Sequence, residues 1–171
     1  MTPSVRDAPS PVAGYAEPEK RPPFLPYLSF MTSFGALVAA ALALAKHQDR
    51  ELPQQVNPDE LLLVGTASHK LARLLSKDKV TSPLRAPFTE LEGNGGPAEF
   101  EERSRGTGVR KAIGELLICP FCLGLWVVAG FSVGLLFAPR VTRFVASLFT
   151  ALTISDFFQI AYKAAEEKGL G

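Results

Sequence analysis

The chain has 171 residues, a formal net charge of +1 and a hydrophobic content of 47%. This balance excludes a general nucleic-acid binder, because no domain-wide basic field exists to attract phosphates. The two cysteines lie three positions apart, which excludes the disulfide framework of a small secreted protein.

The N-terminal segment differs in composition from the rest of the chain. Residues 1–26 hold half of the 14 prolines and few large apolar side chains before Phe24. This composition predicts a disordered tail over residues 1–26, because such a segment buries too little apolar surface to fold. A cleaved signal peptide is not expected, since the first apolar run begins only after this lead. We predict a membrane helical domain over residues 27–165 and a short C-terminal tail over 166–171.

Three apolar runs are long enough for membrane-spanning helices, which need about 20 residues. Two uncharged runs of 24 residues occupy positions 22–45 and 116–139. A third run, 144–162, is interrupted only by the charge of Asp156. These runs predict an all-α fold, an integral membrane helical bundle of three to four transmembrane helices.

The fourth candidate span, residues 59–77, is more polar than the others. It begins as Asp-Glu-Leu-Leu-Leu-Val and then carries His69, Lys70 and Arg73. Two interpretations stay open, a span whose inner end is polar and an amphipathic helix that lies at the membrane interface.

The distribution of Lys and Arg predicts the orientation of the bundle. With four spans, three of these residues lie in the tail, seven in the loop 77–115 and two at the C-terminus, 12 in all against four on the other side. The richer side is normally cytoplasmic. We therefore expect the loop and both termini in the cytoplasm; with three spans only the N-terminus changes side.

The loop 77–115 has a pattern of its own. Two prolines predict an extended segment at 82–87, the glycines at 92–97 predict a turn, and 98–105 favours a short helix with mixed charges. The loop is either a solvated connector or a docking surface for a protein partner, with Arg85 as the candidate contact. Its basic residues also suit anionic lipid headgroups.

The sequence Cys119-Pro-Phe-Cys122 precedes a long apolar run, and Pro120 predicts a helix start with Cys119 as its N-cap. Three interpretations stay open. The pair is a thiol-redox centre, although the chain has no second cysteine pair to relay electrons. It is half of a tetrahedral zinc site, completed by a second subunit or by other side chains. Alternatively, the cysteines are small apolar residues that pack well.

Three polar residues are expected at one depth near the cytoplasmic face. Counted along their helices from the loop side, His69, Cys122 and Asp156 lie seven or eight residues in. They are candidates to complete a zinc shell with Cys119. A carboxylate inside a membrane helix needs a proton or a partner, so Asp156 is predicted to pair with Arg73, Lys70 or His69.

Two motifs carry a resemblance to a known family. The stretch SHKLARLLSKDKVTSPLRAPF (68–88), followed by GELLICPFCLGLW (114–126), resembles an uncharacterised family of small bacterial membrane proteins. That family is a domain of unknown function with a sporulation-associated member, and the likeness covers residues 60–165. The resemblance implies a bacterial integral membrane protein and carries over no catalytic roles.

Together these features predict a non-enzymatic, multi-pass protein of the bacterial inner membrane, with a structural or partner-docking role. The expected partners are the lipid bilayer, a protein that binds the cytoplasmic loop and a second copy of the chain, with no cofactor. The alternative is a membrane thiol-redox or zinc-dependent protein centred on Cys119 and Cys122.

Overall fold

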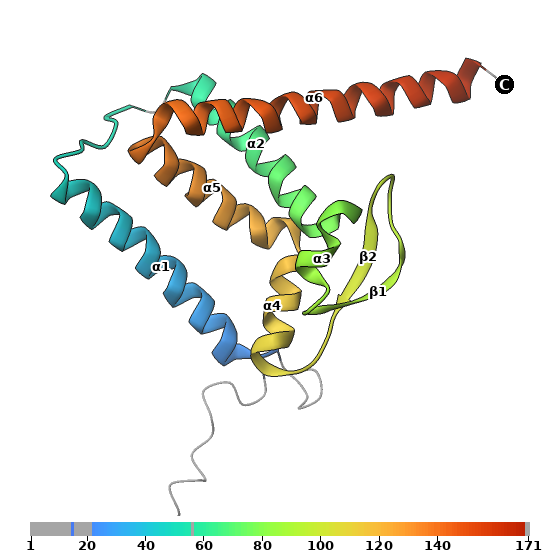
Figure 1. Cartoon of the computed structure of the whole chain (residues 1–171), viewed down its shortest axis with the longest axis horizontal. Helices are drawn as coiled ribbons and strands as arrows, with labels where there is room; N and C mark the ends of the chain where they lie inside the picture. Colours follow the sequence, from blue (N-terminus) through green and yellow to red (C-terminus); the bar gives the residue numbers. More distant parts are fainter. Residues whose placement is uncertain (1–14, 16–21, 56, 170–171) are drawn as a thin grey trace, which may run out of the picture.

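The structure is a computed structural model that describes residues 15, 22–55 and 57–169. Most of these residues are helical, and the remainder includes one two-stranded sheet (Figure 1). The elements in chain order are α1 (Phe24–His47), α2 (Pro58–Lys77), the 3₁₀ turn η2 (Lys79–Thr81), α3 (Ser82–Arg85), β1 (Thr89–Asn94), β2 (Phe100–Ser104), α4 (Gly108–Ile118), α5 (Pro120–Phe137) and α6 (Pro139–Gly169).

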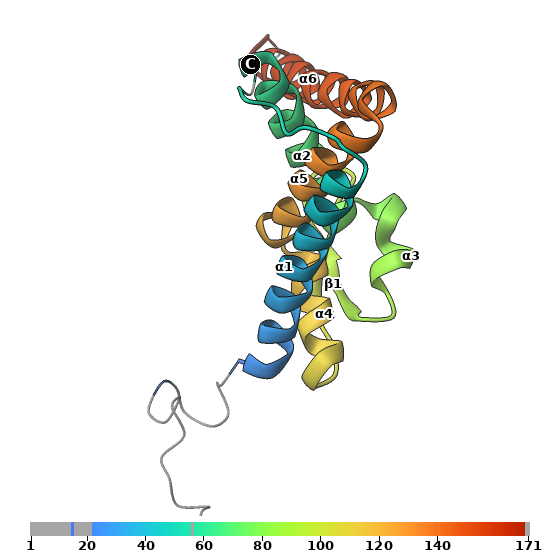
Figure 2. The ribbon, with the colours of Figure 1, turned by 90° about the vertical axis from the view of Figure 1, so that its left-hand side faces the viewer.

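Helix α1 runs beside α5 in the same direction (Figure 2). The Phe34 and Trp126 rings meet edge to face with centroids 5.2 Å apart. After the end of α1, the Arg50 guanidinium donates to the Leu136 carbonyl at 2.9 Å and lies over the Phe137 ring. The end of the molecule that carries Arg50 is called the far end below. The opposite end, which carries the β1–β2 hairpin, is called the hairpin end.

Helix α2 runs from the far end to the hairpin end. The first part of α6 packs against it and points in the same general direction, and the two helices then diverge (Figure 1). At the far end Arg143 of α6 pairs with Glu60 of α2 at 2.9 Å, and further along Asp156 pairs with Lys70 at 2.7 Å. The four long helices α1, α2, α5 and α6 therefore alternate in direction. The last turns of α6 extend beyond the other helices (Figure 1).

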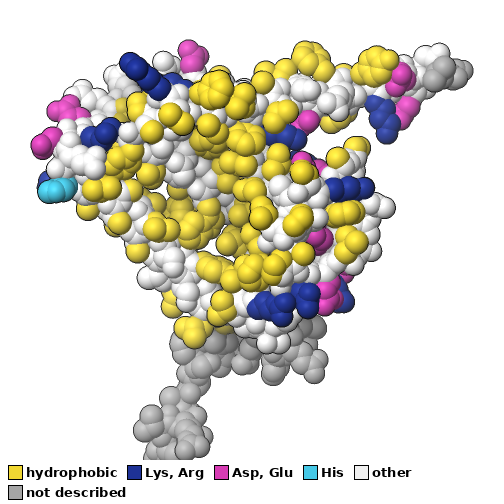
Figure 3. Space-filling model, in the orientation of Figure 1, with side chains coloured by type: hydrophobic (Ala, Val, Ile, Leu, Met, Phe, Trp, Pro, Cys, Tyr) yellow, Lys and Arg dark blue, Asp and Glu magenta, His cyan; other side chains and the backbone are white. Residues whose placement is uncertain are grey.

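The core lies where α2, α5 and α6 meet, and its buried residues are mostly small. Ala67 and Ala146 are fully buried there beside Val64 and Phe131. Small side chains let helix backbones approach closely, which is how helices commonly pack inside membranes. Outside this seam the helices expose apolar side chains, which cover much of the face in Figure 3.

Three helices among the described residues are long and apolar enough to cross a membrane: α1, α5 and α6. Helix α2, the more polar fourth candidate, has 20 residues and packs against both α5 and α6. The structure thus contains the three apolar helices expected from the sequence.

The segment between α2 and α4, residues 78–107, is called the hairpin unit below, and the sequence predictions for it were partly wrong. Residues 82–85 form one helical turn instead of an extended segment, because a proline at the start of a helix is tolerated. Residues 100–104 form strand β2, antiparallel to β1, instead of a helix. Inward and outward positions alternate along β2, as they must in a strand with one face packed on the protein. The fold is therefore mostly helical and not purely so.

The predicted domain boundaries differ in part from the observed elements. Residues 1–14 and 16–21 of the predicted tail lie outside the described residues, and α1 already begins at Phe24. Helix α6 continues to Gly169, past the predicted limit of the membrane domain at residue 165. Residues 170 and 171 also lie outside the described part.

Candidate functional site

A polar cleft of about 370 Å³ opens where α2, α6 and the hairpin unit meet. Its volume lies within the roughly 300–1,000 Å³ typical of small-ligand sites. Its walls carry charged groups of both signs. The polar side chains that line it are Lys70, Arg73, Asp78, Glu99, Asp156, Gln159 and Lys163.

Polar bonds along the α2–α6 seam position the cleft. Thr150 of α6 donates its hydroxyl to the Leu63 carbonyl of α2 at 3.1 Å, and Thr153 of α6 also donates to the Thr66 carbonyl of α2, at 3.5 Å. The Arg143–Glu60 ion pair holds the far end of the seam. These directional contacts set the register of α6 against α2. Asp156, Gln159 and Lys163, spaced by three and four residues, then share the face turned to the cleft.

The Lys70–Asp156 ion pair forms the floor of the cleft between the two helices. Its N–O distance is 2.7 Å, and the Lys70 side chain is only 13% exposed whereas Asp156 is 43% exposed. A buried ammonium needs a nearby carboxylate to offset its desolvation. Of the three partners predicted for Asp156, the structure provides Lys70.

Arg73 pairs with Glu99 instead, a residue that the sequence analysis did not single out. Its Nε and Nη2 donate to the two carboxylate oxygens at 2.8 and 2.9 Å, the bidentate geometry that favours arginine. Glu99 is buried just before β2, and the preceding Ala98 has a left-handed backbone (φ 62°). No local sequence signal indicates that this glutamate returns to α2, because the pairing depends on the fold of the hairpin unit.

Asp78 follows the last residue of α2 and turns the chain towards the hairpin. The pKa of its carboxyl is raised, first because burial disfavours the charged form and further because Glu99 and Asp156 lie nearby. Lys70 and Arg73 oppose this shift. Within the described part of the chain the Asp78 carboxylate makes no ion pair of its own, so it remains available at the edge of the cleft.

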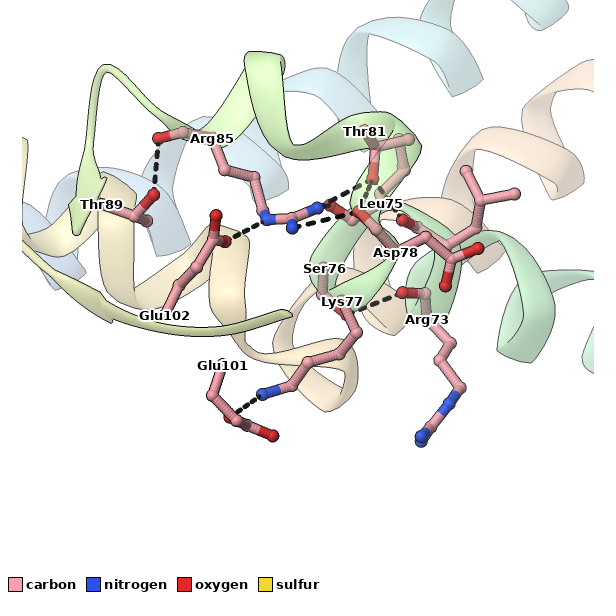
Figure 4. A network of polar contacts seen from close by, with 11 residues as sticks. Arg73, Leu75, Ser76, Lys77, Asp78, Thr81, Arg85, Thr89, Glu101 and Glu102 are labelled. Atoms are coloured by element: carbon pink, nitrogen blue, oxygen red, sulfur yellow. Dashed lines mark hydrogen bonds and ion pairs between the residues drawn. The ribbon is translucent and has the colours of Figure 1, made fainter. Parts of the chain in front are cut away.

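A buried arginine anchors the hairpin unit to the end of α2 (Figure 4). The Arg85 side chain is fully buried and pairs with Glu102 of β2, which is itself buried. It also donates to the Leu75 carbonyl at 2.9 Å, the Thr81 hydroxyl at 2.8 Å and the Asp78 carbonyl at 3.1 Å. The bond to Leu75 satisfies a carbonyl that the end of α2 leaves without a helical partner. Arg85 therefore holds the unit together from inside and does not offer its side chain to a docking partner.

The two cysteines lie where α4 ends and α5 begins. Cys119 is the N-cap of α5, and its sulfur accepts a hydrogen bond from the Cys122 backbone N–H at 3.2 Å. Both thiols are free, and Cys122 is exposed. Close by, the Tyr27 hydroxyl of α1 donates to the Glu115 carboxylate of α4. The predicted helix start at Pro120 is therefore present.

The expected convergence of His69, Cys122 and Asp156 does not occur. In residues 15, 22–55 and 57–169, no group of three or more His, Cys, Asp and Glu side chains is close enough to hold a metal ion. His69 precedes Lys70, and successive helical residues point about 100° apart. His69 consequently faces outward, whereas Lys70 faces Asp156. Equal depth along the helices therefore does not bring these side chains together, because they point in different directions around their helices.

These features define the class of protein, a mostly helical chain with three helices apolar enough to cross a membrane and a polar cleft beside a small hairpin. The chain belongs to the family described as Protein of unknown function (DUF1360), whose model matches residues 63–162. It is similar to the sporulation protein YjcA of Bacillus subtilis (strain 168), with 41% identity over 81 residues, 46% of this chain and 68% of that relative. No solved structure matches the chain.

The family match confirms the resemblance inferred from the motifs at 68–88 and 114–126. It covers most of α2, the hairpin unit, α4, α5 and α6 through residue 162. Every polar residue of the cleft except Lys163 lies inside it, whereas α1 lies outside. The cleft thus belongs to the shared part of the chain.

Proposed function

We propose that this protein is a non-enzymatic, multi-pass protein of the bacterial inner membrane whose hairpin unit docks a protein partner in the cytoplasm. The observation that carries the proposal is the construction of the hairpin unit. A solvated connector has no need of a buried arginine, yet Arg85 spans from the end of α2 to β2. Such a scaffold supports a surface of defined shape.

The alternating directions of the four long helices support a four-span topology. Helix α2 packs against both α5 and α6, which supports placing it in the same environment. Its 20 residues extend about 30 Å at 1.5 Å each. Both described ends of the helical domain then lie on the same side as the hairpin unit. Of the Lys and Arg residues, only four lie at the far end: Lys46, Arg50, Arg140 and Arg143. The hairpin end is therefore richer in basic residues and faces the cytoplasm.

The outer surface of the hairpin unit offers apolar groups for a partner. Val80, Leu84 and Leu91 are all more than half exposed, although in this topology the unit lies outside the bilayer. Exposed apolar side chains on a water-facing unit are typical of protein interaction sites. Charged neighbours such as Glu90 and Arg103, which pair across the hairpin at 2.7 Å, supply a polar surround of the kind found at interface rims.

Site-specific photocrosslinking in living cells tests this role. A photoreactive amino acid is placed at Leu91 or Leu84, and at Leu52 as the matched control, because Leu52 is equally exposed but lies at the far end. We expect one discrete protein adduct from the two hairpin positions and none from Leu52, and the adduct should be lost in Arg85→Met. Adducts of the same mass from all three positions, or none from the hairpin unit, would contradict the docking role.

A thiol or zinc function at Cys119 and Cys122 is the second candidate, favoured by the free thiols and the exposure of Cys122. Zinc ligation would need ligands from a second copy of the chain to complete four. Metal analysis and thiol trapping of protein taken directly from cells test this function. Bound zinc or a reversibly formed disulfide would support it, and free thiols without metal would exclude both forms.

A further inference from the structure

Two oppositely charged side chains of the polar cleft take no part in the ion pairs formed inside it, so they can bind a ligand. Lys70 pairs with Asp156, and Arg73 pairs with Glu99. The two remaining charged side chains, Asp78 and Lys163, lie on different walls, one at the end of α2 and the other on α6. The cleft is therefore complementary to a ligand that carries separated positive and negative groups.

On the α2 wall, Asp78 is suited to receive a cation that can donate hydrogen bonds. Its carboxylate is half-buried and makes no ion pair in the described residues. A primary ammonium that enters the cleft would supply the missing partner and a charge-assisted hydrogen bond. A quaternary ammonium has no N–H to donate and would gain less.

Lys163 on the α6 wall and Arg73 on the α2 wall both line the cleft and carry the positive charge that a phosphate needs. The ion pair of Lys163 with Glu167 is long, at 4.0 Å, and both side chains are exposed, so this pairing contributes little. Arg73 uses Nε and Nη2 for Glu99, which leaves Nη1 outside that bond. Ammonium and guanidinium groups are the side chains that commonly bind phosphate, and this cleft is lined by one of each.

Exposed apolar side chains lie on α6 at and near the cleft. Ile160 lines it and is 65% exposed, and Phe157 on the same helix is 67% exposed. A ligand with hydrocarbon chains would cover these side chains while its polar head occupied the cleft. A small polar metabolite would leave them uncovered.

We propose that the cleft binds a phospholipid whose headgroup carries both a phosphate and a primary ammonium, with the ammonium at Asp78, the phosphate at Lys163 and Arg73, and the acyl chains along α6. This inference rests on the membrane placement proposed above, because only then do lipids reach α6. Phosphatidylethanolamine has this chemistry. Phosphatidylcholine lacks the N–H donors, and phosphatidylglycerol lacks the cation.

Binding is measured with the purified full chain in detergent, as the rise in thermal unfolding temperature on titration with short-chain lipids. Phosphatidylethanolamine should bind about tenfold more tightly than phosphatidylcholine or phosphatidylglycerol, the effect of one charge-assisted hydrogen bond. Glycerophosphoethanolamine, which has no acyl chains, should give no shift at the same concentrations. Equal binding of the three lipids, or tighter binding of phosphatidylglycerol, overturns the proposal. Tight binding of the chain-free headgroup would assign the cleft to a soluble ligand instead.

Paired variants locate the two contacts. Asp78→Asn should abolish the preference for phosphatidylethanolamine over phosphatidylcholine, whereas Asp49→Asn at the far end should keep it. Lys163→Gln should weaken the binding of all three lipids. Lys168→Gln, on the same helix but outside the cleft, should leave their binding unchanged. A preference that survives Asp78→Asn overturns the assignment. Lipid binding is measured in detergent and does not depend on which side of the membrane the hairpin unit faces. The lipid proposal and the topology can therefore fail separately.

Discussion

The two sides of the bundle are held together by different means. Helix α1 meets α5 through apolar side chains such as Phe34 and Trp126. In the described residues, the polar side-chain contacts that tie it to the bundle lie near its two ends, where Tyr27 donates to Glu115 of α4 and Arg50, just after α1, donates to the Leu136 carbonyl. Helix α6 meets α2 through a series of polar bonds along the seam, from Arg143–Glu60 to Lys70–Asp156. Apolar packing alone defines helix register weakly, because one methyl group fits much like another. The register that assembles the polar cleft is therefore specified by directional bonds.

This contrast also separates the shared part of the chain from the rest. The α2–α6 seam and the hairpin unit lie within the family match, whereas α1 lies outside it. The elements that build the cleft thus belong to the part shared with the family. Substitutions of the polar residues in this part should lower the stability of the fold. Control substitutions at apolar or exposed positions should change the stability little.

The largest effect is expected at Arg85. Arg85→Met removes the guanidinium and leaves the buried Glu102 carboxylate unpaired, which typically costs about 3–5 kcal/mol. We expect the hairpin unit to exchange its backbone amide hydrogens rapidly, as measured by hydrogen exchange in detergent. Arg103→Met is the control, because the Arg103 side chain is 64% exposed. Ion pairs of exposed side chains contribute about 0–1 kcal/mol to the free energy of unfolding. Equal losses in the two variants would contradict the anchoring role of Arg85.

The next effect concerns the close approach of α4 to the hairpin unit. A Cβ added at Gly114 would lie 2.5 Å from the Phe88 carbonyl oxygen, a backbone atom. Gly114→Ala should therefore cost about 1–3 kcal/mol of overpacking strain, measured as a lower midpoint of thermal unfolding. Gly124→Ala in α5 meets nothing within 4 Å and should be neutral or stabilising, because alanine favours helices. If Gly124→Ala destabilises as much, close packing at Gly114 is not the cause.

A smaller effect is expected from the central ion pair of the seam. Asp156→Leu leaves the largely buried Lys70 ammonium without its partner, at a cost of about 1–3 kcal/mol. The double variant Lys70→Leu with Asp156→Leu should recover most of the loss, because no unpaired charge remains. Thermal unfolding in detergent measures both. A double variant as unstable as the single one would mean that Asp156 acts through a different neighbour.

The smallest effect is a pH dependence at Asp78. Because its pKa is raised in the folded protein, this carboxyl favours folding while it is protonated. That contribution is complete below the unfolded value of about 3.9 and is lost as pH rises through the raised pKa. Asp78→Asn should therefore raise the unfolding temperature at neutral pH and have little effect in acid. An Asp78→Asn variant that is less stable at neutral pH would reverse the sign and contradict the assigned cause, burial.

The helices were predictable from the sequence, and the hairpin unit was not. Long uncharged runs identify α1 and α5 by composition, and Pro120 marks the start of α5. Strand β2 escaped prediction because Glu101, Glu102 and Arg103 have no strand preference, so its pairing with β1 comes from tertiary structure. Arg85 looked like a surface residue because arginine is rarely fully buried. Its burial is explained by the contact with Glu102 together with the bonds to Leu75, Thr81 and Asp78.

The cleft was predictable in part. The spacing of Asp156, Gln159 and Lys163 placed them on one helix face, and the need of Asp156 for a partner pointed to α2. The choice of Lys70 over Arg73 was not determined, because both lie near the same depth and only the position of Glu99 decides between them. The expected convergence of His69, Cys122 and Asp156 did not occur, for the related reason that equal depth along the helices does not determine the direction in which His69 points.

The central claim is that the hairpin unit and the α5–α6 connection lie on opposite sides of the membrane. Single cysteines at Asn94 and at Pro139, in a background with Cys119→Ala and Cys122→Ala, are labelled in intact cells with a membrane-impermeant thiol reagent. We predict that Pro139→Cys reacts in intact cells, and that Asn94→Cys reacts only after the inner membrane is opened. Labelling of both positions from the same side would contradict the topology and, with it, the cytoplasmic docking role.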